Sequence, residues 1–128
     1  MTGKDLINYW QTTAEEALAT ADDLFRLGRY NYCLFFCHLA VEKALKGLVF
    51  KKTHSHALPI HRLVKLAQQA KLQLPPEIAE ALKEITTWNI EARYESFKRE
   101  FSLKTDKEFT RKWFQRVKEI YKWLKNQY

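Results

Sequence analysis

Glycine and proline are scarce in this sequence, which contains 3 of each in 128 residues. These two residue types shape most tight turns between short strands, so their scarcity excludes a β-sandwich or barrel with many turns. Alanine, leucine, glutamate and lysine, which favour helices, are plentiful. The composition therefore predicts an all-α protein. A chain of this length, with 46% hydrophobic residues, is expected to form one domain over residues 1–128.

Long apolar runs and cysteines are also few. No run approaches the roughly 20 apolar residues that cross a bilayer, and the N-terminal stretch MTGKDLINYW lacks the apolar segment of a signal peptide. The 2 cysteines, Cys33 and Cys37, would share one face of a helix, which favours buried thiols over a disulfide framework. We expect a cytoplasmic protein without membrane attachment.

The sequence contains no glycine-rich phosphate loop, no GxSxG elbow and no HExxH or paired CxxC motif. His54, His56 and His61 cluster in HSHALPIH, but zinc requires three or four rigidly held ligands. We therefore expect histidines that are solvated or that cap the next helix, no metal and no cofactor. Glu42 and Lys46 are spaced to support a helix as an ion pair rather than to catalyse.

Hydrophobic periodicity predicts the helices. Thr2 and Asp5 can cap a first helix that ends at Gly28, and the residues from Tyr30 to Phe50 are apolar around most of a helix, which indicates the central, most buried one. Three further helices are expected. The first is marked by Leu63, Leu66, Ala67 and Ala70, and the second by Pro75-Pro76 followed by Ile78, Leu82, Ile85 and Trp88. The third begins at a Thr105 and Glu108 capping box and continues with Phe109, Trp113, Val117, Ile120 and Leu124. The lengths and short connections predict an up-and-down bundle of four to five helices.

Positive charge is concentrated near the C-terminus. Residues 98–128 hold 10 basic and 4 acidic residues, whereas residues 1–97 hold 12 and 11. Five basic residues share one face of the last predicted helix, bordered by Phe114, Tyr121 and Tyr128; they are Lys107, Arg111, Lys118, Lys122 and Lys125. Such a face can attract phosphates or an acidic partner, or it can be solvated surface, and the sequence leaves both interpretations open.

The segment WNIEARYESF, residues 88–97, places Arg93 directly after the apolar face of the fourth predicted helix. An arginine cannot shed its charge when partly buried, so Arg93 requires an anion. That anion is either a carboxylate, such as Glu91 or Glu95, or a phosphate or acidic group of a partner.

The order of several short features resembles the HEPN domain, a family of helical bundles. The matching residues are Trp10 and Ala14 with Ala17, Asp22 and Leu24, then Gly28 and Tyr30, the run AVEKALKG from Ala40 to Gly47, His61 with Leu63, and ARY from Ala92 to Tyr94. The resemblance covers nearly the whole chain. It implies a homodimer, a helical bundle, and a minimal nucleotidyltransferase as partner protein in a toxin and antitoxin module.

Many HEPN proteins are metal-independent ribonucleases. In their active site an arginine is followed, four to six positions later, by a histidine. Arg93 matches that arginine, but the following window YESFKRE contains no histidine and has Lys98 and Arg99 at the expected spacing. These two side chains can hold a phosphate but are poor general bases near neutral pH. His38 is a substitute only if the fold brings it near Arg93.

We therefore expect a partner subunit that binds nucleotide or RNA in a cleft at the dimer interface, with Arg93, Tyr94, Lys98 and Arg99 as the binding residues. Tyr94 would pack its ring there and offer a hydroxyl, and its modification by the transferase is a further hypothesis. The alternatives are a ribonuclease toxin that uses Arg93 with a non-standard proton donor, and a non-catalytic structural homodimer.

Overall fold

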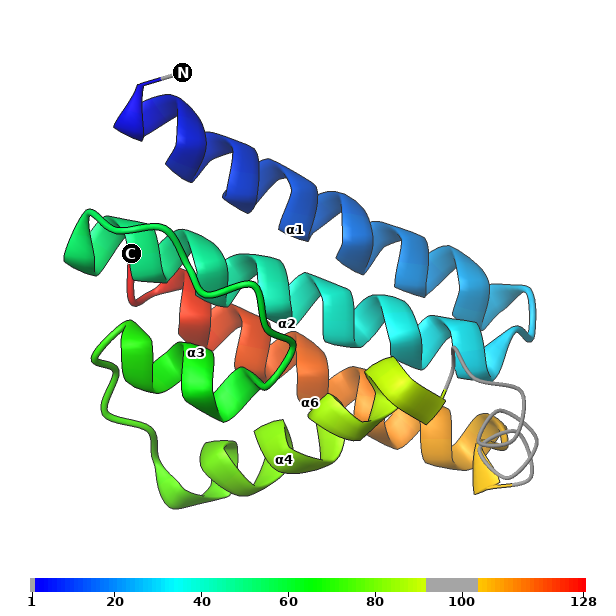
Figure 1. Ribbon diagram of the computed structural model, residues 1–128. Coiled ribbons are helices and arrows are strands. Elements are labelled where there is room, and N and C mark those ends of the chain that lie inside the picture. Colours follow the sequence, from blue (N-terminus) through cyan, green and yellow to red (C-terminus); the bar gives the residue numbers. More distant parts are fainter. Residues whose placement is uncertain (1, 92–103) are drawn as a thin grey trace.

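The structure, a computed structural model, describes residues 2–91 and 104–128. Within these ranges the chain forms five helices and no strand. The helices are α1 (Gly3–Arg26), α2 (Tyr30–Thr53), α3 (Leu63–Gln69), α4 (Pro76–Glu91) and α6 (Lys107–Lys125). Figure 1 shows that α1 and α2 run in opposite directions, as do α4 and α6. The predicted all-α, up-and-down bundle is confirmed over the residues described.

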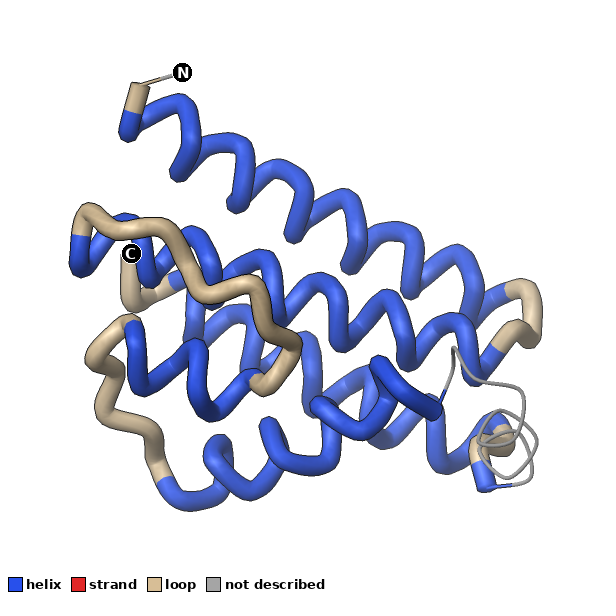
Figure 2. The backbone as a smooth tube through the Cα atoms, viewed as in Figure 1, coloured by secondary structure: helices blue, strands red, loops and turns tan. Residues whose placement is uncertain are grey.

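Helix α2 lies at the centre of the bundle. It packs against α1, α3, α4 and α6, and twelve of its residues are buried. Figure 2 shows the connection from α2 to α3, residues 54–62, turning back along α2 before α3 begins. The apolar run that indicated a central helix therefore marks the element that organises the fold, and the free thiols of Cys33 and Cys37 are buried in it.

Local sequence sets most helix ends. Thr2 and Asp5 form the predicted capping box, Gly28 takes a positive φ of 76° after α1, and Pro76 begins α4. Helix α2 continues three residues beyond the predicted end at Phe50, because no helix breaker follows and Lys51 and Lys52 suit the negative end of a helix dipole.

The start of α6 differs from the predicted capping box. Asp106, not Thr105, is the N-cap, and its Oδ1 accepts a hydrogen bond from the Phe109 amide at 2.8 Å. Thr105 is instead buried. Aspartate and threonine both cap helices well, and a carboxylate adds a favourable interaction with the helix dipole, so the neighbouring residue provides the cap.

Two aromatic residues of α6 lie deeper than the helical wheel predicted. Phe114 and Tyr121, expected at the border of the basic face, are buried, whereas Phe109 and Trp113 of the predicted core stripe are partly exposed. The core-facing side of α6 is therefore rotated from the predicted stripe. The Phe114 ring lies beside Phe25 of α1, with ring centroids 6.0 Å apart, while the main helix that α6 packs against is α2.

Close packing at one end of the bundle involves Gly47 of α2. A Cβ there would lie 2.9 Å from the Trp10 Cβ and would clash with the Tyr128 hydroxyl, which donates to the Ala44 carbonyl at 2.6 Å. Only glycine leaves room for both neighbours. No helix in the part of the chain that the structure describes is long and apolar enough to cross a membrane.

Candidate functional site

The binding residues predicted from the sequence, Arg93, Tyr94, Lys98 and Arg99, lie outside the described residues. The elements on either side of this interval are described. Trp88, near the end of α4, is fully buried and packs edge-on against Trp113, with ring centroids 5.4 Å apart. Its indole N–H donates to Glu84, and Lys104 lies 3.6 Å from the same carboxylate. The two ends of the interval are therefore both anchored close to Glu84.

A buried carboxylate on α2 is the centre of the main polar cluster. The residue Glu42 is 5% exposed, and its carboxylate accepts a hydrogen bond from His61 Nδ1 at 2.8 Å. Its other oxygen lies 3.1 Å from the Lys46 ammonium. We call His38, Glu42, Lys46 and His61 the Glu42 cluster. The predicted helix-supporting pair of Glu42 and Lys46 is confirmed, and it belongs to a larger network.

His38 is the most enclosed member of the Glu42 cluster, at 1% exposure. Its Nε2 lies 3.2 Å from the His61 carbonyl, which can only accept, so Nε2 carries the proton. The other ring nitrogen, Nδ1, is buried without a hydrogen-bond partner. Burial lowers the pKa of His38, despite the Glu42 carboxylate 3.7 Å away, so the ring is neutral near pH 7.

The electrostatic balance at Glu42 favours its charged form. Burial alone would raise the pKa of its carboxyl, but the hydrogen bond from His61 and the Lys46 charge more than offset this, and the pKa is lowered. Glu42 in turn orients the His61 ring, because Nδ1 donates to it, on a side chain that is 51% exposed.

The same cluster holds the connection between α2 and α3 in place. His61 binds α2 through both its ring, which donates to Glu42, and its carbonyl, which accepts from His38. Earlier in the same connection, the Leu58 amide donates to the Gln69 side chain, which in turn donates to the His56 carbonyl. Side chains of α2, His38 and Glu42, and of α3, Gln69, therefore fix a connection that has no regular secondary structure of its own.

The three histidines considered as metal ligands are separated. His61 contacts Glu42, whereas the rings of His54 and His56 both lie beside Phe50, at centroid distances of 6.3 and 5.8 Å. No group of three or more histidine, cysteine, aspartate or glutamate side chains in residues 2–91 and 104–128 is arranged to hold a metal ion. His54 is the C-cap residue of α2, in the left-handed conformation, rather than a cap of the following helix.

Sequence reasoning missed the Glu42 cluster as a unit. Its members come from α2 and from a connection that follows it, so no single helical pattern joins them. One signal was present: Glu42 stands directly after Ala40 and Val41 and before Ala44 and Leu45, all buried. A carboxylate inside such a run requires partners, and His38 and Lys46, each one turn away, were the nearest candidates.

The predicted basic face of α6 is exposed along its length. Lys107, Arg111, Lys118, Lys122 and Lys125 are all exposed. Arg111 pairs with Glu108, Lys125 pairs with Glu15 of α1 at 3.2 Å, and the Lys118 ammonium lies 4.7 Å from the Phe114 ring centroid. Within the described residues, Lys107 and Lys122 are the members of this face without an ion pair or ring contact, so part of its charge remains available to solvent or to a partner.

Comparisons with known proteins agree with this architecture. The HEPN domain family matches residues 7–127. Among solved structures, the crystal structure of TT1696 from Thermus thermophilus superposes with a TM-score of 0.80 at 21% identity, covering 95% of this chain and 98% of that one. At this identity the likeness concerns the fold. No curated protein matches. The family match spans nearly the whole chain, and the protein therefore belongs to the HEPN domain family.

Proposed function

We propose that this chain is the partner subunit of a minimal nucleotidyltransferase and that it binds nucleotide or RNA in a cleft around Arg93 at a homodimer interface. One observation carries the proposal: a member of the HEPN domain family has YESFKRE after Arg93, with no histidine in that window. Such a site retains the charge that holds a phosphate but lacks the usual proton carrier.

The positions of three of the four histidines support binding over proton transfer. His38, the candidate substitute, is almost fully enclosed and donates its one N–H to the His61 carbonyl. His54 and His56 lie beside Phe50. In this proposal Arg93 holds the phosphate, Lys98 and Arg99 add positive charge, and Tyr94 packs its ring in the cleft. The subunit is a cytoplasmic single domain over residues 1–128 that needs no cofactor.

Co-expression with a minimal nucleotidyltransferase from the same genome tests the partner role. Co-purification at low salt is expected, and Arg93→Ala is expected to weaken RNA or nucleotide binding by the protein. Arg111→Ala provides the matched control, because Arg111 is an exposed arginine of α6. Two proteins that never co-purify would refute the partner role, and equal binding by the two variants would refute the Arg93 cleft.

A second candidate function is metal-independent RNA cleavage, and the His61 geometry favours it specifically. Glu42 orients the His61 ring on an exposed side chain, an arrangement suited to a general base. Cleavage of RNA in EDTA that is lost in both Arg93→Ala and His61→Ala would establish this function. RNA left intact by the wild-type protein would exclude it.

A further inference from the structure

Aromatic and basic side chains form a continuous strip across α1 and α2. Tyr9 and Trp10 of α1 pack edge-on, with ring centroids 5.3 Å apart. The Lys43 ammonium lies 5.8 Å from the Tyr9 ring centroid and 5.6 Å from that of Trp10, and Lys46 lies 5.9 Å from Trp10. Lys46 then reaches Glu42, which holds His61. We call Tyr9, Trp10, Lys43, Lys46 and His61 the α1–α2 strip.

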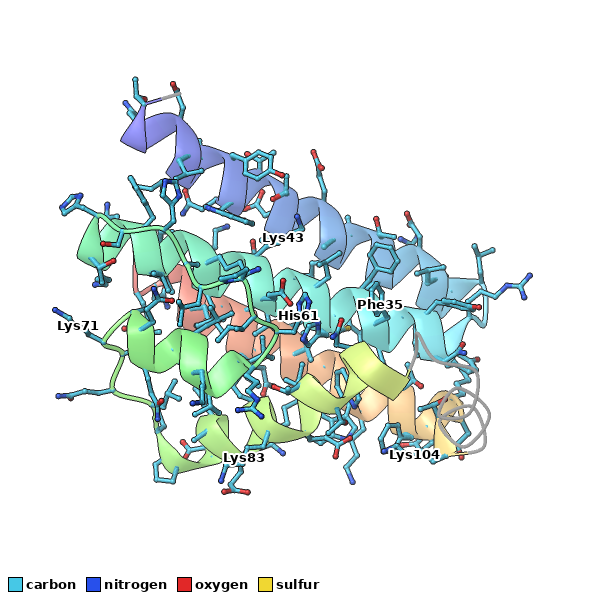
Figure 3. The ribbon with its side chains drawn as sticks, in the orientation of Figure 1. Phe35, Lys43, His61, Lys71, Lys83 and Lys104 are labelled. Atoms are coloured by element: carbon cyan, nitrogen blue, oxygen red, sulfur yellow. The ribbon has the colours of Figure 1, made fainter. Side chains whose placement is uncertain are left out.

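The strip runs from α1 across α2 to the connection that precedes α3. Lys43 and Lys46 lie nearly one turn apart on the same side of the helix. In Figure 3 Lys43 lies between α1 and α2, and His61 lies where the connection to α3 meets α2. Tyr9, Trp10, Lys43 and Lys46 are joined by ring and ammonium contacts, and the buried Glu42 carboxylate joins Lys46 to His61. None of them belongs to residues 92–103.

The groups of the strip retain binding capacity. The ammonium-to-ring distances are near the outer limit of about 6 Å for a cation–π contact, so these contacts are weak. Lys43 forms no ion pair with a carboxylate anywhere in the described chain. Tyr9 is 45% exposed, and the His61 side chain is 51% exposed. A phosphate would therefore meet an unpaired ammonium beside an accessible ring.

We propose that the α1–α2 strip binds single-stranded RNA, with a base stacked on the exposed Tyr9 ring and the adjacent phosphate on Lys43. Aromatic faces beside backbone-neutralising cations are the arrangement that single-stranded nucleic acids require. Glu42 positions Lys46 and His61 at one end of the strip. The inference deepens the proposed function, because it names RNA as the ligand class and adds a second contact surface to the Arg93 cleft.

An acidic protein segment would use the lysines but would gain little from the exposed Tyr9 ring. The strip also differs from the basic face of α6, where the aromatic residues Phe114 and Tyr121 are buried and cannot stack on a base. These two contrasts favour RNA as the occupant of the strip.

Binding of a short, labelled, single-stranded RNA of mixed sequence, followed by fluorescence anisotropy at low salt, tests the proposal. Tyr9→Ala and Lys43→Gln are each expected to weaken binding about tenfold, in the range measured for removing one base-stacking contact. Tyr9→Phe, which keeps the ring, is expected to bind as the wild type does. Lys107→Gln and Lys122→Gln provide controls that remove the same charge elsewhere, and each should change the affinity less than about twofold.

Several outcomes would overturn the proposal. Equal losses in Lys43→Gln and the two α6 controls would indicate diffuse attraction to the net charge, and equal losses in Tyr9→Ala and Tyr9→Phe would exclude stacking. Polyglutamate that displaces the RNA at equal charge concentration would indicate an acidic partner instead. Absence of any RNA binding by the wild type would also refute the strip. Co-purification with the transferase is a separate measurement, so the partner role can survive failure of the strip.

Discussion

Two charged regions on neighbouring helices, the Glu42 cluster of α2 and the basic face of α6, contain ion pairs of almost equal length. Lys46 lies 3.1 Å from Glu42, and Lys125 lies 3.2 Å from Glu15. Their surroundings differ. The Lys46 and Glu42 side chains are 14% and 7% exposed, whereas those of Lys125 and Glu15 are 58% and 56% exposed.

This difference shows that distance alone does not set the importance of an ion pair. A solvated pair gains little over two hydrated charges, whereas loss of one partner from a buried pair leaves the other charge without compensation. The Glu42 cluster also fixes a backbone connection, which the α6 pair does not. Variants of both pairs test whether burial has the consequence expected from it.

Replacing the central carboxylate should have the largest effect. Glu42→Ala removes the acceptor of His61 and the counter-charge of Lys46, so we expect the free energy of unfolding to fall by about 3 kcal/mol. Glu15→Ala, the matched control on the exposed pair, should cost less than about 1 kcal/mol. Urea denaturation at pH 7 measures both. Similar shifts in the two midpoints would show that the buried cluster contributes no more than a surface pair.

Acidification should reduce the stability that the Glu42 cluster contributes, in two steps. The pKa of His38 is lowered from its ordinary value of 6.5, chiefly by burial, so the unfolded chain binds the extra proton first and stability falls as the pH drops below 6.5. The pKa of Glu42 is lowered from 4.5, because its partners outweigh burial, so a second loss begins below 4.5. Full stability from this cluster is therefore expected above pH 6.5.

The variant His38→Gln separates the two losses of stability. It should remove the decline between 6.5 and 4.5 while keeping the decline below 4.5, which can be followed by urea denaturation across this pH range. If His38→Gln left the pH profile unchanged, His38 would not be the group that controls stability between pH 6.5 and 4.5. Glu15→Ala should keep the wild-type profile in that interval, because its carboxylate is exposed.

Much of the fold was predictable because it depends on patterns within single helices. The capping residues Thr2 and Asp5, the turn at Gly28 and the start of α4 at Pro76 are local features, and each was expected from the sequence. The rotation of α6 was not predictable, because the contact of Phe114 with Phe25 of α1 depends on how the helices are placed in the bundle. A helical wheel shows which residues share a face but not how many neighbours that face will have.

The candidate site was less predictable for the same reason. The Glu42–Lys46 pair lies within α2 and was expected, but His61 reaches Glu42 only because the connection after α2 turns back along that helix. The predicted residues Arg93, Tyr94, Lys98 and Arg99 rest on the family resemblance and stay a prediction, because they lie outside the described residues.

A double-mutant cycle compares the two ion pairs directly. The coupling energy between Lys125 and Glu15 is expected to be about 0.5 kcal/mol or less, because both side chains are exposed. The cycle for Lys46→Met and Glu42→Gln should give a larger coupling, since both groups are enclosed. Raising the salt concentration should reduce only the first value noticeably. Coupling energies that are equal in the two pairs, at low salt and at high salt alike, would contradict the role assigned to burial.

The smallest expected effects concern unpaired lysines at the two ends of α6, and their signs should differ. Lys107 begins the helix, where its charge opposes the positive end of the dipole, whereas Lys122 lies in the last turn, where the dipole is negative. Lys107→Gln is therefore expected to stabilise the fold by roughly 0.3 kcal/mol, and Lys122→Gln to destabilise it by a similar amount. High-precision urea denaturation at low salt resolves the difference between the two variants, which high salt should abolish. Shifts of the same sign would mean that relief of general charge repulsion, rather than position along the helix, governs this face.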